Sequence, residues 1–318
     1  MSFIRSILAG ATIGVAGLAM TTAAARAEFI NVLTGGTSGV YYPLGVALSE
    51  LYAAGIPGAR TQVQATKASV ENLNLLAAGR GEVAFALGDS VMAGWEGKQE
   101  AGFKAPLTNL RAIGGFYDNY IQIVAEKSAG ITTVTDLKGK TISVGAPASG
   151  TELNARAIFA AAGMSYDDMS KVEFLPFSES AELIKNRQLQ STLQSAGLGA
   201  AFIKDLATTH EVTLVAVPAE IVNKIGAPYK ASAIPAGTYN GQTADVPTAA
   251  VTNILVTSDK VSDETVYQMT RLMFENVDKL KAAHSAAGAL DPAKAIQALP
   301  IPLHPGAEKY YREIGVLK

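Results

Sequence analysis

A short apolar strand, a glycine-rich loop and a helix open the chain, and the same layout returns in its second third. Residues 29–33 form an apolar run typical of a buried strand, and Thr34-Gly35-Gly36-Thr37-Ser38-Gly39 follows it. Apolar residues then recur at helical spacing through residue 52. Residues 141–144, 145–151 and 152–162 repeat this order, and Gly163 ends the second helix. Such alternation predicts an α/β fold with a mainly parallel sheet.

Each of these loops leads into the start of a helix, where backbone N–H groups and the helix dipole favour an anion. Taken alone, a glycine loop of this kind is more often a plain strand-to-helix turn. Two such helix starts, one in each half of the chain, favour a ligand held between two lobes. The residues that we expect at this ligand are Gly36, Thr37, Ser38, Tyr41 and Tyr42 from the first loop and helix, and Ser149, Gly150, Thr151 and Asn154 from the second.

Further candidates follow the next strands, because ligands of open α/β sheets sit beyond the carboxyl ends of the strands. Ser69 and Asn72 come after a predicted strand at residues 61–65, and Asp89 comes after a strand at 82–87. Helix capping alone is the alternative role for Ser69 and Asp89. We add Tyr117 and Asn119, which lie between strand-like runs at residues 107–115 and 120–125.

Residues 1–27 have the pattern of a secretory signal peptide. Arg5 is followed by an apolar stretch, and Ala25-Arg26-Ala27 is a small-x-small cleavage site. The apolar stretch is short for a membrane anchor, which is the alternative. The sequence therefore predicts a soluble exported protein, with a mature chain that begins near Glu28.

Composition excludes several functional classes. Without Arg5 and Arg26 the mature chain has 24 basic and 28 acidic residues, a net charge of −4, so we expect no nucleic acid partner. There are no cysteines, and the three histidines are far apart in sequence, so we expect no metal site. No catalytic motif is present, and Thr34–Gly39 lacks the lysine of a phosphate-binding P-loop. We expect no cofactor and no enzymatic activity.

The sequence resembles the TAXI subgroup of solute receptors, which serve tripartite ATP-independent periplasmic (TRAP) transporters. The likeness rests on Phe29–Pro43, Ser69-Val70-Glu71-Asn72-Leu73, Asp89, Gly145–Thr151, Ile234–Tyr239 and Ile301–Gly315, and it covers essentially the whole mature chain. The resemblance implies a monomeric, type II-like periplasmic binding protein that delivers a small carboxylate to the TRAP membrane subunits. Glutamate, glutamine and 2-oxoglutarate are the cargoes that it implies.

A two-lobed fold requires the chain to leave and re-enter its first lobe. We expect two crossing strands near 120–125 and 249–256, with lobe one at 28–121 plus 252–318 and lobe two at 122–251. We also expect a break in the sheet between the lobes. A single amphipathic helix is predicted at 262–282.

The chain departs from the family pattern at Leu87, at Lys67-Ala68, and at Gln190-Ser191 and Gln194–Gly197. Because of these departures, the sequence does not determine which cargo is bound. Lys67 is either a cation that binds a carboxylate of the cargo or a solvated surface residue. Two other hypotheses remain: a binding protein for a non-carboxylate cargo, and an exported interaction protein or antigen without a role in transport.

Overall fold

The computed structural model describes residues 28–318, and the predicted signal peptide lies outside them. Within this part the strands are β1 (Phe29–Leu33), β2 (Arg60–Gln64), β3 (Val83–Leu87), β4 (Leu110–Glu126), β5 (Thr141–Ser143), β6 (Lys171–Glu173), β7 (Ser191–Ala196), β8 (Val212–Val215), β9 (Lys230–Ile234) and β10 (Val246–Ser258). The helices are α1 (Tyr41–Gly55), α2 (Ser69–Ala77), α3 (Gly88–Glu96), α4 (Gly150–Ala161), α5 (Phe177–Lys185), α6 (Ala201–Thr209), α7 (Ala219–Ile225), α8 (Asp263–Glu275), α9 (Val277–Ala283), α10 (Pro292–Ala295) and α11 (Pro305–Glu313), with short 3₁₀ turns between them. None of the helices in residues 28–318 has the length and apolar character that crossing a membrane requires.

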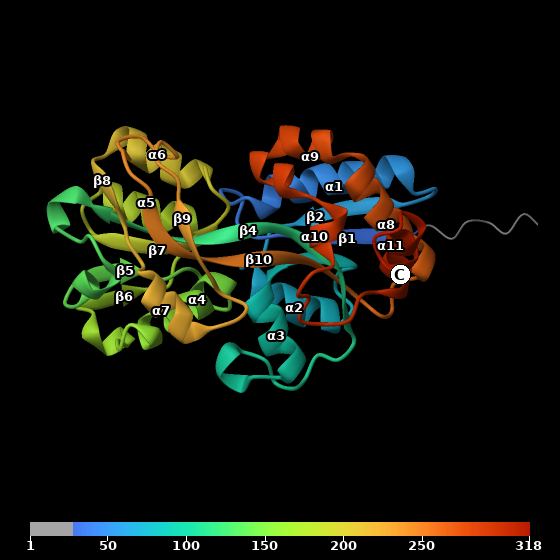
Figure 1. Cartoon of the computed structure of the whole chain (residues 1–318), viewed down its shortest axis with the longest axis horizontal. Helices are drawn as coiled ribbons and strands as arrows, with labels where there is room; N and C mark the ends of the chain where they lie inside the picture. The colour runs from blue at the N-terminus through green and yellow to red at the C-terminus, as the bar shows by residue number, and fades with distance from the viewer. Residues whose placement is uncertain (1–27) are drawn as a thin grey trace, which may run out of the picture.

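Two long strands, β4 and β10, connect the two halves of the molecule (Figure 1). On one side β1 pairs in parallel with β2 and β3, and β3 pairs with β10. On the other side β5 pairs in parallel with β6 and β7, while β7 and β8 pair with β4. We call the part around β1–β3 half one and the part around β5–β9 half two.

The expected crossing strands are present, but the expected break in the sheet is absent. The hydrogen-bonded order runs β2-β1-β3-β10-β4-β7-β5-β6 without interruption, because β10 pairs with β3 of half one and with β4, and β4 pairs with β7 of half two. One apolar cluster also contains residues of both halves, including Leu48 and Phe202. The predicted lobe boundaries fall inside β4 and β10 and remain a prediction.

Two expected elements differ in the structure, and other elements were not expected. Phe116–Asn119 do not interrupt a strand, because they belong to β4, which pairs with β10 across this stretch. The helix expected at 262–282 divides into α8 and α9 at Asn276, whose φ of −125° is not helical and whose side-chain amide donates to the Leu272 carbonyl. Helix α7 and strand β9, which lie between residues 219 and 234, had no counterpart among the expected elements.

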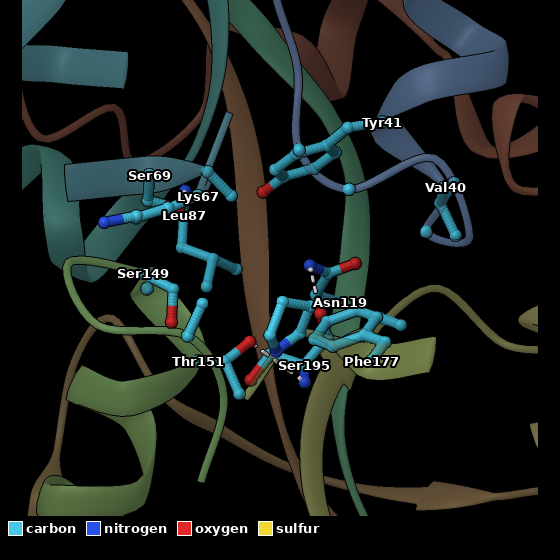
Figure 2. A pocket seen from close by; sticks show the side chains of 18 of the residues that line it. Val40, Tyr41, Lys67, Ser69, Leu87, Asn119, Ser149, Thr151, Phe177 and Ser195 are labelled. Atoms are coloured by element: carbon cyan, nitrogen blue, oxygen red, sulfur yellow. Dashed lines mark hydrogen bonds between the residues drawn. The ribbon is translucent and has the colours of Figure 1, made fainter. Parts of the chain in front are cut away.

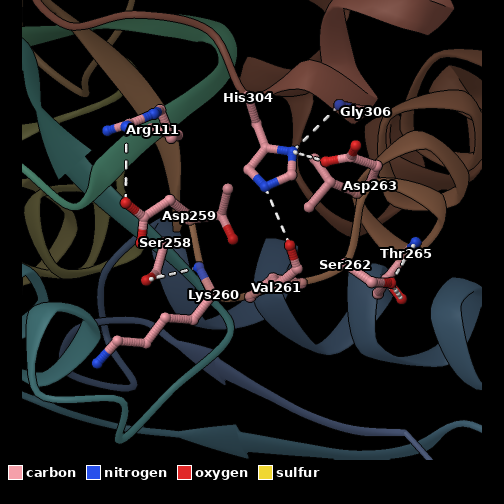
Figure 3. Close-up of polar contacts among 12 residues, drawn as sticks. Arg111, Ser258, Asp259, Lys260, Val261, Ser262, Asp263, Thr265, His304 and Gly306 are labelled. Atoms are coloured by element: carbon pink, nitrogen blue, oxygen red, sulfur yellow. Dashed lines mark hydrogen bonds and ion pairs between the residues drawn. The ribbon is translucent and has the colours of Figure 1, made fainter.

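The C-terminal segment is fixed to half one around His304 (Figure 3). His304 is 1% exposed, and its Nδ1 accepts a hydrogen bond from the Gly306 N–H at the start of α11. Its Nε2 lies 3.1 Å from the Val261 carbonyl oxygen, which only accepts, so Nε2 carries the proton. Burial lowers the pKa of His304, which agrees with the neutral imidazole that this pattern requires. His304 therefore caps α11. In the same way His284 caps the 3₁₀ turn Ser285–Ala289, and Ser149 caps α4.

Candidate functional site

A cavity of about 130 Å³ lies between the two halves (Figure 2). Half one supplies the loop after β1, the loop before α2 and the end of β3, and half two supplies the loop after β5, the start of α5 and the end of β7. This is the carboxyl edge of the parallel strands, where ligands of open α/β sheets bind. The lining residues are Gly35, Gly36, Ser38, Gly39, Val40, Tyr41, Thr66, Lys67, Ala68, Ser69, Leu87, Tyr117, Asn119, Ala146, Ser149, Gly150, Thr151, Pro176, Phe177, Ser195 and Ala196.

The first glycine loop presents free backbone donors to this cavity. Helix α1 begins only at Tyr41, and the N–H groups of Gly36, Thr37 and Ser38 make no hydrogen bond with any described residue. Gly36 and Ser38 line the cavity, whereas the side chain of Thr37 is exposed and Thr37 does not line it. Tyr42 is half-buried and also lies outside the lining. An anion at this loop would meet N–H groups that nothing else in the described chain occupies.

The second loop approaches half one closely. The Ser149 hydroxyl accepts from the Glu152 N–H at 3.2 Å and so caps α4, which leaves its own proton free to donate. At Gly150, a Cβ atom would lie 2.6 Å from the Ser69 Oγ, so glycine is required for this approach. The Thr151 Oγ1 accepts from the Ser195 N–H at 3.4 Å. The Gly150–Ser69 approach brings the start of α4 against the start of α2, while Thr151 ties α4 to β7.

Strand β4 contributes two buried polar atoms that have no partner among the described residues. They are the Tyr117 hydroxyl and the Asn119 Oδ1, on side chains that are 4% and 3% exposed. The other end of the Asn119 amide donates to the Ser195 carbonyl at 3.3 Å, so Oδ1 is the acceptor that remains (Figure 2). Burying an unpaired polar atom costs about 1–3 kcal/mol, and a ligand that pairs with both atoms would recover this cost.

Tyr41 is held rigidly beside these atoms. Its hydroxyl donates to the Asn253 Oδ1, and its ring stacks on Phe85 with centroids 5.0 Å apart. Burial raises the pKa of Tyr41, so its hydroxyl stays protonated. The proton of Tyr41 is thus committed to Asn253, and a ligand would find only its oxygen as an acceptor.

Ser69 and Asn72 hold α2 in place, and neither caps this helix. The residue before the helix is Ala68, and the Ser69 hydroxyl instead accepts from the Leu87 N–H at 3.1 Å. Asn72 is fully buried, and its amide donates to the carbonyls of Thr34 and Phe85. Ser69 lines the cavity, whereas Asn72 lies behind it.

Asp89 and Asn154 contact each other and do not line the cavity. The Asp89 Oδ2 accepts from the Asn154 Nδ2 at 2.7 Å and from the Tyr229 hydroxyl at 2.6 Å. Its Oδ1 accepts from the Ser90 N–H, and the residue at the helix N-cap is Leu87, so Asp89 does not cap α3. Burial raises the pKa of Asp89, although Tyr229 and Ser90 oppose this by donating to the charged form. Every one of these partners donates, which is the pattern of an ionised carboxylate.

Several lining residues were not among the sequence candidates. Leu87, Ala68, Ser195 and Ala196 are among them, at positions where the sequence differs from the TAXI receptors that it resembles, so that difference was a usable signal. Gln190, another departure, holds β5 and β7 together through Thr141.

The remaining lining residues, such as Val40, Pro176 and Phe177, are mainly apolar or small. Phe177 begins α5 after β6, and the rule that ligands bind beyond strand ends could have identified it.

The lining combines donors with an apolar wall. Lys67 is exposed and is the one cationic residue among the described residues that line the cavity. Nowhere in residues 28–318 do three or more histidine, cysteine, aspartate or glutamate side chains gather as metal ligands would. The arrangement can hold a small molecule that has an anionic group at the loops and an apolar surface against Leu87 and Phe177.

Comparisons with known proteins give a family and a fold. The sequence model of the NMT1-like family matches residues 32–315. Among solved structures, PhnD1 from Prochlorococcus marinus (MIT 9301) in complex with methylphosphonate is 10% identical, with a TM-score of 0.59 over 92% of this chain and 100% of that chain.

Two further structures are similar at this level. A putative L-cystine ABC transporter from Listeria monocytogenes is 14% identical, with a TM-score of 0.51 over 82% and 97% of the two chains. The alkanesulfonate-binding protein SsuA from Xanthomonas axonopodis pv. citri, bound to MOPS, is 14% identical, with a TM-score of 0.50 over 93% and 96%. The likeness shows that the fold is the two-lobed α/β fold of periplasmic binding proteins.

Proposed function

The chain belongs to the NMT1-like family, and from this we propose that it is a periplasmic solute-binding protein that encloses a small anion between its halves. One observation carries the proposal. The cavity between the halves contains backbone donors at Gly36 and Ser38 and buried atoms of Tyr117 and Asn119, none of which has a hydrogen-bond partner within residues 28–318. A fold that served only as a scaffold would gain nothing from leaving these groups unpaired.

We propose in addition that the cargo is a small carboxylate such as glutamate, glutamine or 2-oxoglutarate, bound and released unchanged. The protein then delivers it as a monomer to the membrane subunits of a TRAP transporter. Support comes from the sequence resemblance to the TAXI receptors and from donors in both halves of the cavity. One carboxylate would lie at Gly36–Ser38 and a second polar group at Ser149–Thr151.

The apolar wall of the cavity and the ligands bound in the similar structures require other anions to be considered as cargo. PhnD1 was solved with methylphosphonate and SsuA with MOPS, which carry phosphonate and sulfonate groups. Helix starts and backbone N–H groups bind all these anions by the same physics. The test must therefore include carboxylates, phosphonates and sulfonates.

A thermal-shift screen of the mature protein decides between them. Amino acids, dicarboxylates with four to six carbons, methylphosphonate and alkanesulfonates form the panel. A cargo at 100 times its Kd should stabilise the protein by about 2.7 kcal/mol. Stabilisation by carboxylates alone supports the proposed cargo, and stabilisation by phosphonates or sulfonates alone contradicts it. No shift with any anion would favour an exported interaction protein, and product in the samples would indicate an enzyme.

Two variants then test the anion site by calorimetric titration with the ligand that gave the largest shift. Ser38→Ala and Thr151→Ala should each weaken binding about tenfold or more, because a hydrogen bond to a charged group contributes roughly 1.5–3 kcal/mol. Thr37→Ala is the matched control, since Thr37 lies in the same loop but does not line the cavity. Unchanged affinity in both test variants would remove the two loops as the anion site and direct attention to Lys67 and Asn119.

A further inference from the structure

A second set of contacts joins the two halves outside the cavity. Asp89 belongs to α3 in half one, while Asn154 belongs to α4 and Tyr229 precedes β9, both in half two. The Asp89 carboxylate accepts from the Asn154 amide and the Tyr229 hydroxyl at 2.7 and 2.6 Å, and the same Asn154 amide lies 2.8 Å from the Tyr229 oxygen. None of these three residues lines the cavity.

We propose that Asp89, Asn154 and Tyr229 form a latch that closes the two halves by protein–protein contacts and needs no cargo. The bonds between the halves end on an ionised carboxylate, and hydrogen bonds to charged groups are the stronger kind. Because Asp89 is half-buried between the two halves, water competes less well for its carboxylate while the latch is closed. Opening the halves separates Asp89 from both donors at once.

The face of α4 that carries Asn154 is built for this contact. Gly150 lies one turn before Asn154, so both residues point toward half one, and Gly150 packs against Ser69 and Leu87. Leu153 packs on an apolar cluster of half one. Two further hydrogen bonds join the two halves. The Arg156 side chain donates to the Glu100 carbonyl at 2.8 Å, and the Glu71 N–H donates to the Ala148 carbonyl at 3.2 Å.

The latch is connected to the cavity through Ser195. The Ser195 hydroxyl donates to the Asn154 Oδ1 at 2.5 Å, which orients the amide so that its Nδ2 faces Asp89. Ser195 itself lines the cavity and holds Asn119 through its carbonyl. Asp89, Asn154 and Tyr229 are therefore positioning residues: they act on the cargo through closure and through Ser195.

Closure can be measured in the cargo-free protein by pulsed electron paramagnetic resonance. The chain has no cysteine, so Gln99→Cys in half one and Asp167→Cys in half two provide a unique pair of exposed labelling sites. With the latch intact, we expect a short distance population from the closed form. Tyr229→Phe should lower the closed-to-open ratio about tenfold or more, the range that corresponds to the loss of one hydrogen bond to a charged group.

The matched control is Tyr267→Phe. Tyr267 donates to the Glu313 carboxylate at 2.7 Å, a bond of the same chemistry that stays within half one. It should leave the distance distribution unchanged. Two results would overturn the proposal. One is a spin-label distance distribution that Tyr229→Phe leaves unchanged. The other is the absence of a closed population in the chain with Tyr229 intact.

Exchanging the carboxylate of Asp89 and the amide of Asn154 distinguishes a latch from a contact that only supports the fold. Asn154→Asp places a second carboxylate against Asp89 and should open the halves further by repulsion. Adding Asp89→Asn restores one amide–carboxylate pair in the reverse sense and should recover the closed population. Circular dichroism confirms that each variant is folded, and failure of the folded double variant to close would contradict the latch. Because no cargo is added, this outcome is independent of whether the proposed cargo is right.

Discussion

At the scale of single residues, the informative atoms are those that the fold leaves unpaired. The hydroxyls of Tyr117 and Tyr52 are both buried without a partner among the described residues, but only Tyr117 lines the cavity. Asn119 presents its Oδ1 beside Tyr117. Because nearly all buried polar groups in folded proteins are paired, unpaired atoms at a cavity indicate a ligand.

The two tyrosines give a paired prediction. Tyr117→Phe should leave the free energy of unfolding unchanged or raise it, since it removes a buried unpaired hydroxyl, and it should weaken cargo binding about tenfold. Tyr52→Phe should have the same effect on stability and none on binding. Urea unfolding and calorimetric titration of both variants measure the two quantities. Equal effects of the two variants on binding would contradict a ligand contact at Tyr117.

Ala68 lines the same cavity and has a strained backbone conformation. Its φ of 74° and ψ of −144° lie in a region that glycine adopts and that costs other residues about 1–3 kcal/mol. Strain of this kind is typical of loops that hold a ligand.

Ala68→Gly should therefore stabilise the protein by about 1 kcal/mol, because relief of strain outweighs the extra entropy of glycine in the unfolded chain. Ala160→Gly, within helix α4, is the control and should destabilise by about 0.5–1 kcal/mol. Urea denaturation at neutral pH gives both values. A loss of stability in Ala68→Gly would show that the strain at this position is not relieved by glycine.

At the scale of elements, the start of α4 has two roles. Ser149 caps the helix through the Glu152 N–H, and the loop before it closes on half one. Ser262 caps α8 in the same way through the Thr265 N–H, far from the cavity. The two serines therefore allow capping to be measured apart from binding.

Ser149→Ala and Ser262→Ala should each lower the free energy of unfolding by about 1 kcal/mol, the usual cost of losing an N-cap hydroxyl. Only Ser149→Ala should also weaken cargo binding, since Ser149 lines the cavity and Ser262 does not. Thermal unfolding with and without cargo separates the two effects. If Ser262→Ala weakened binding equally, the change at Ser149 would reflect stability alone.

At the scale of the whole molecule, β4 and β10 determine how the halves can move. They are the strands through which the continuous sheet passes from one half to the other, and residues 121/122 and 251/252 lie within them. Binding proteins respond to ligands by shifting an open–closed equilibrium, which requires the halves to move as units.

We predict rigid-body motion about these two strands. In the Tyr229→Phe background, spin-label distances within half one, between Gln99→Cys and Lys294→Cys, should equal those of the unmodified chain. Distances within half two, between Asp167→Cys and Glu220→Cys, should also be unchanged, and only the pair across the seam should lengthen. A change within either half would contradict the lobe boundaries at 28–121 plus 252–318 and 122–251.

The sequence by itself determined the α/β class, the two glycine loops, the crossing strands and nine of the fourteen candidate residues that line the cavity: Gly36, Ser38, Tyr41, Ser69, Tyr117, Asn119, Ser149, Gly150 and Thr151. These features could be predicted because hydrophobic periodicity, glycine loops and strand ends depend on residues that are close together in sequence. Thr37, Tyr42, Asn72, Asp89 and Asn154 lie outside the lining.

Only the tertiary structure decided the rest. Whether Asp89 caps its own helix or binds Tyr229, 140 residues away in sequence, depends on how the halves pack together. The same holds for the continuity of the sheet and for Phe177, which reaches the cavity because α5 begins there. Contacts between residues distant in sequence leave no local pattern, so the latch and the cavity wall emerge only when the chain is folded.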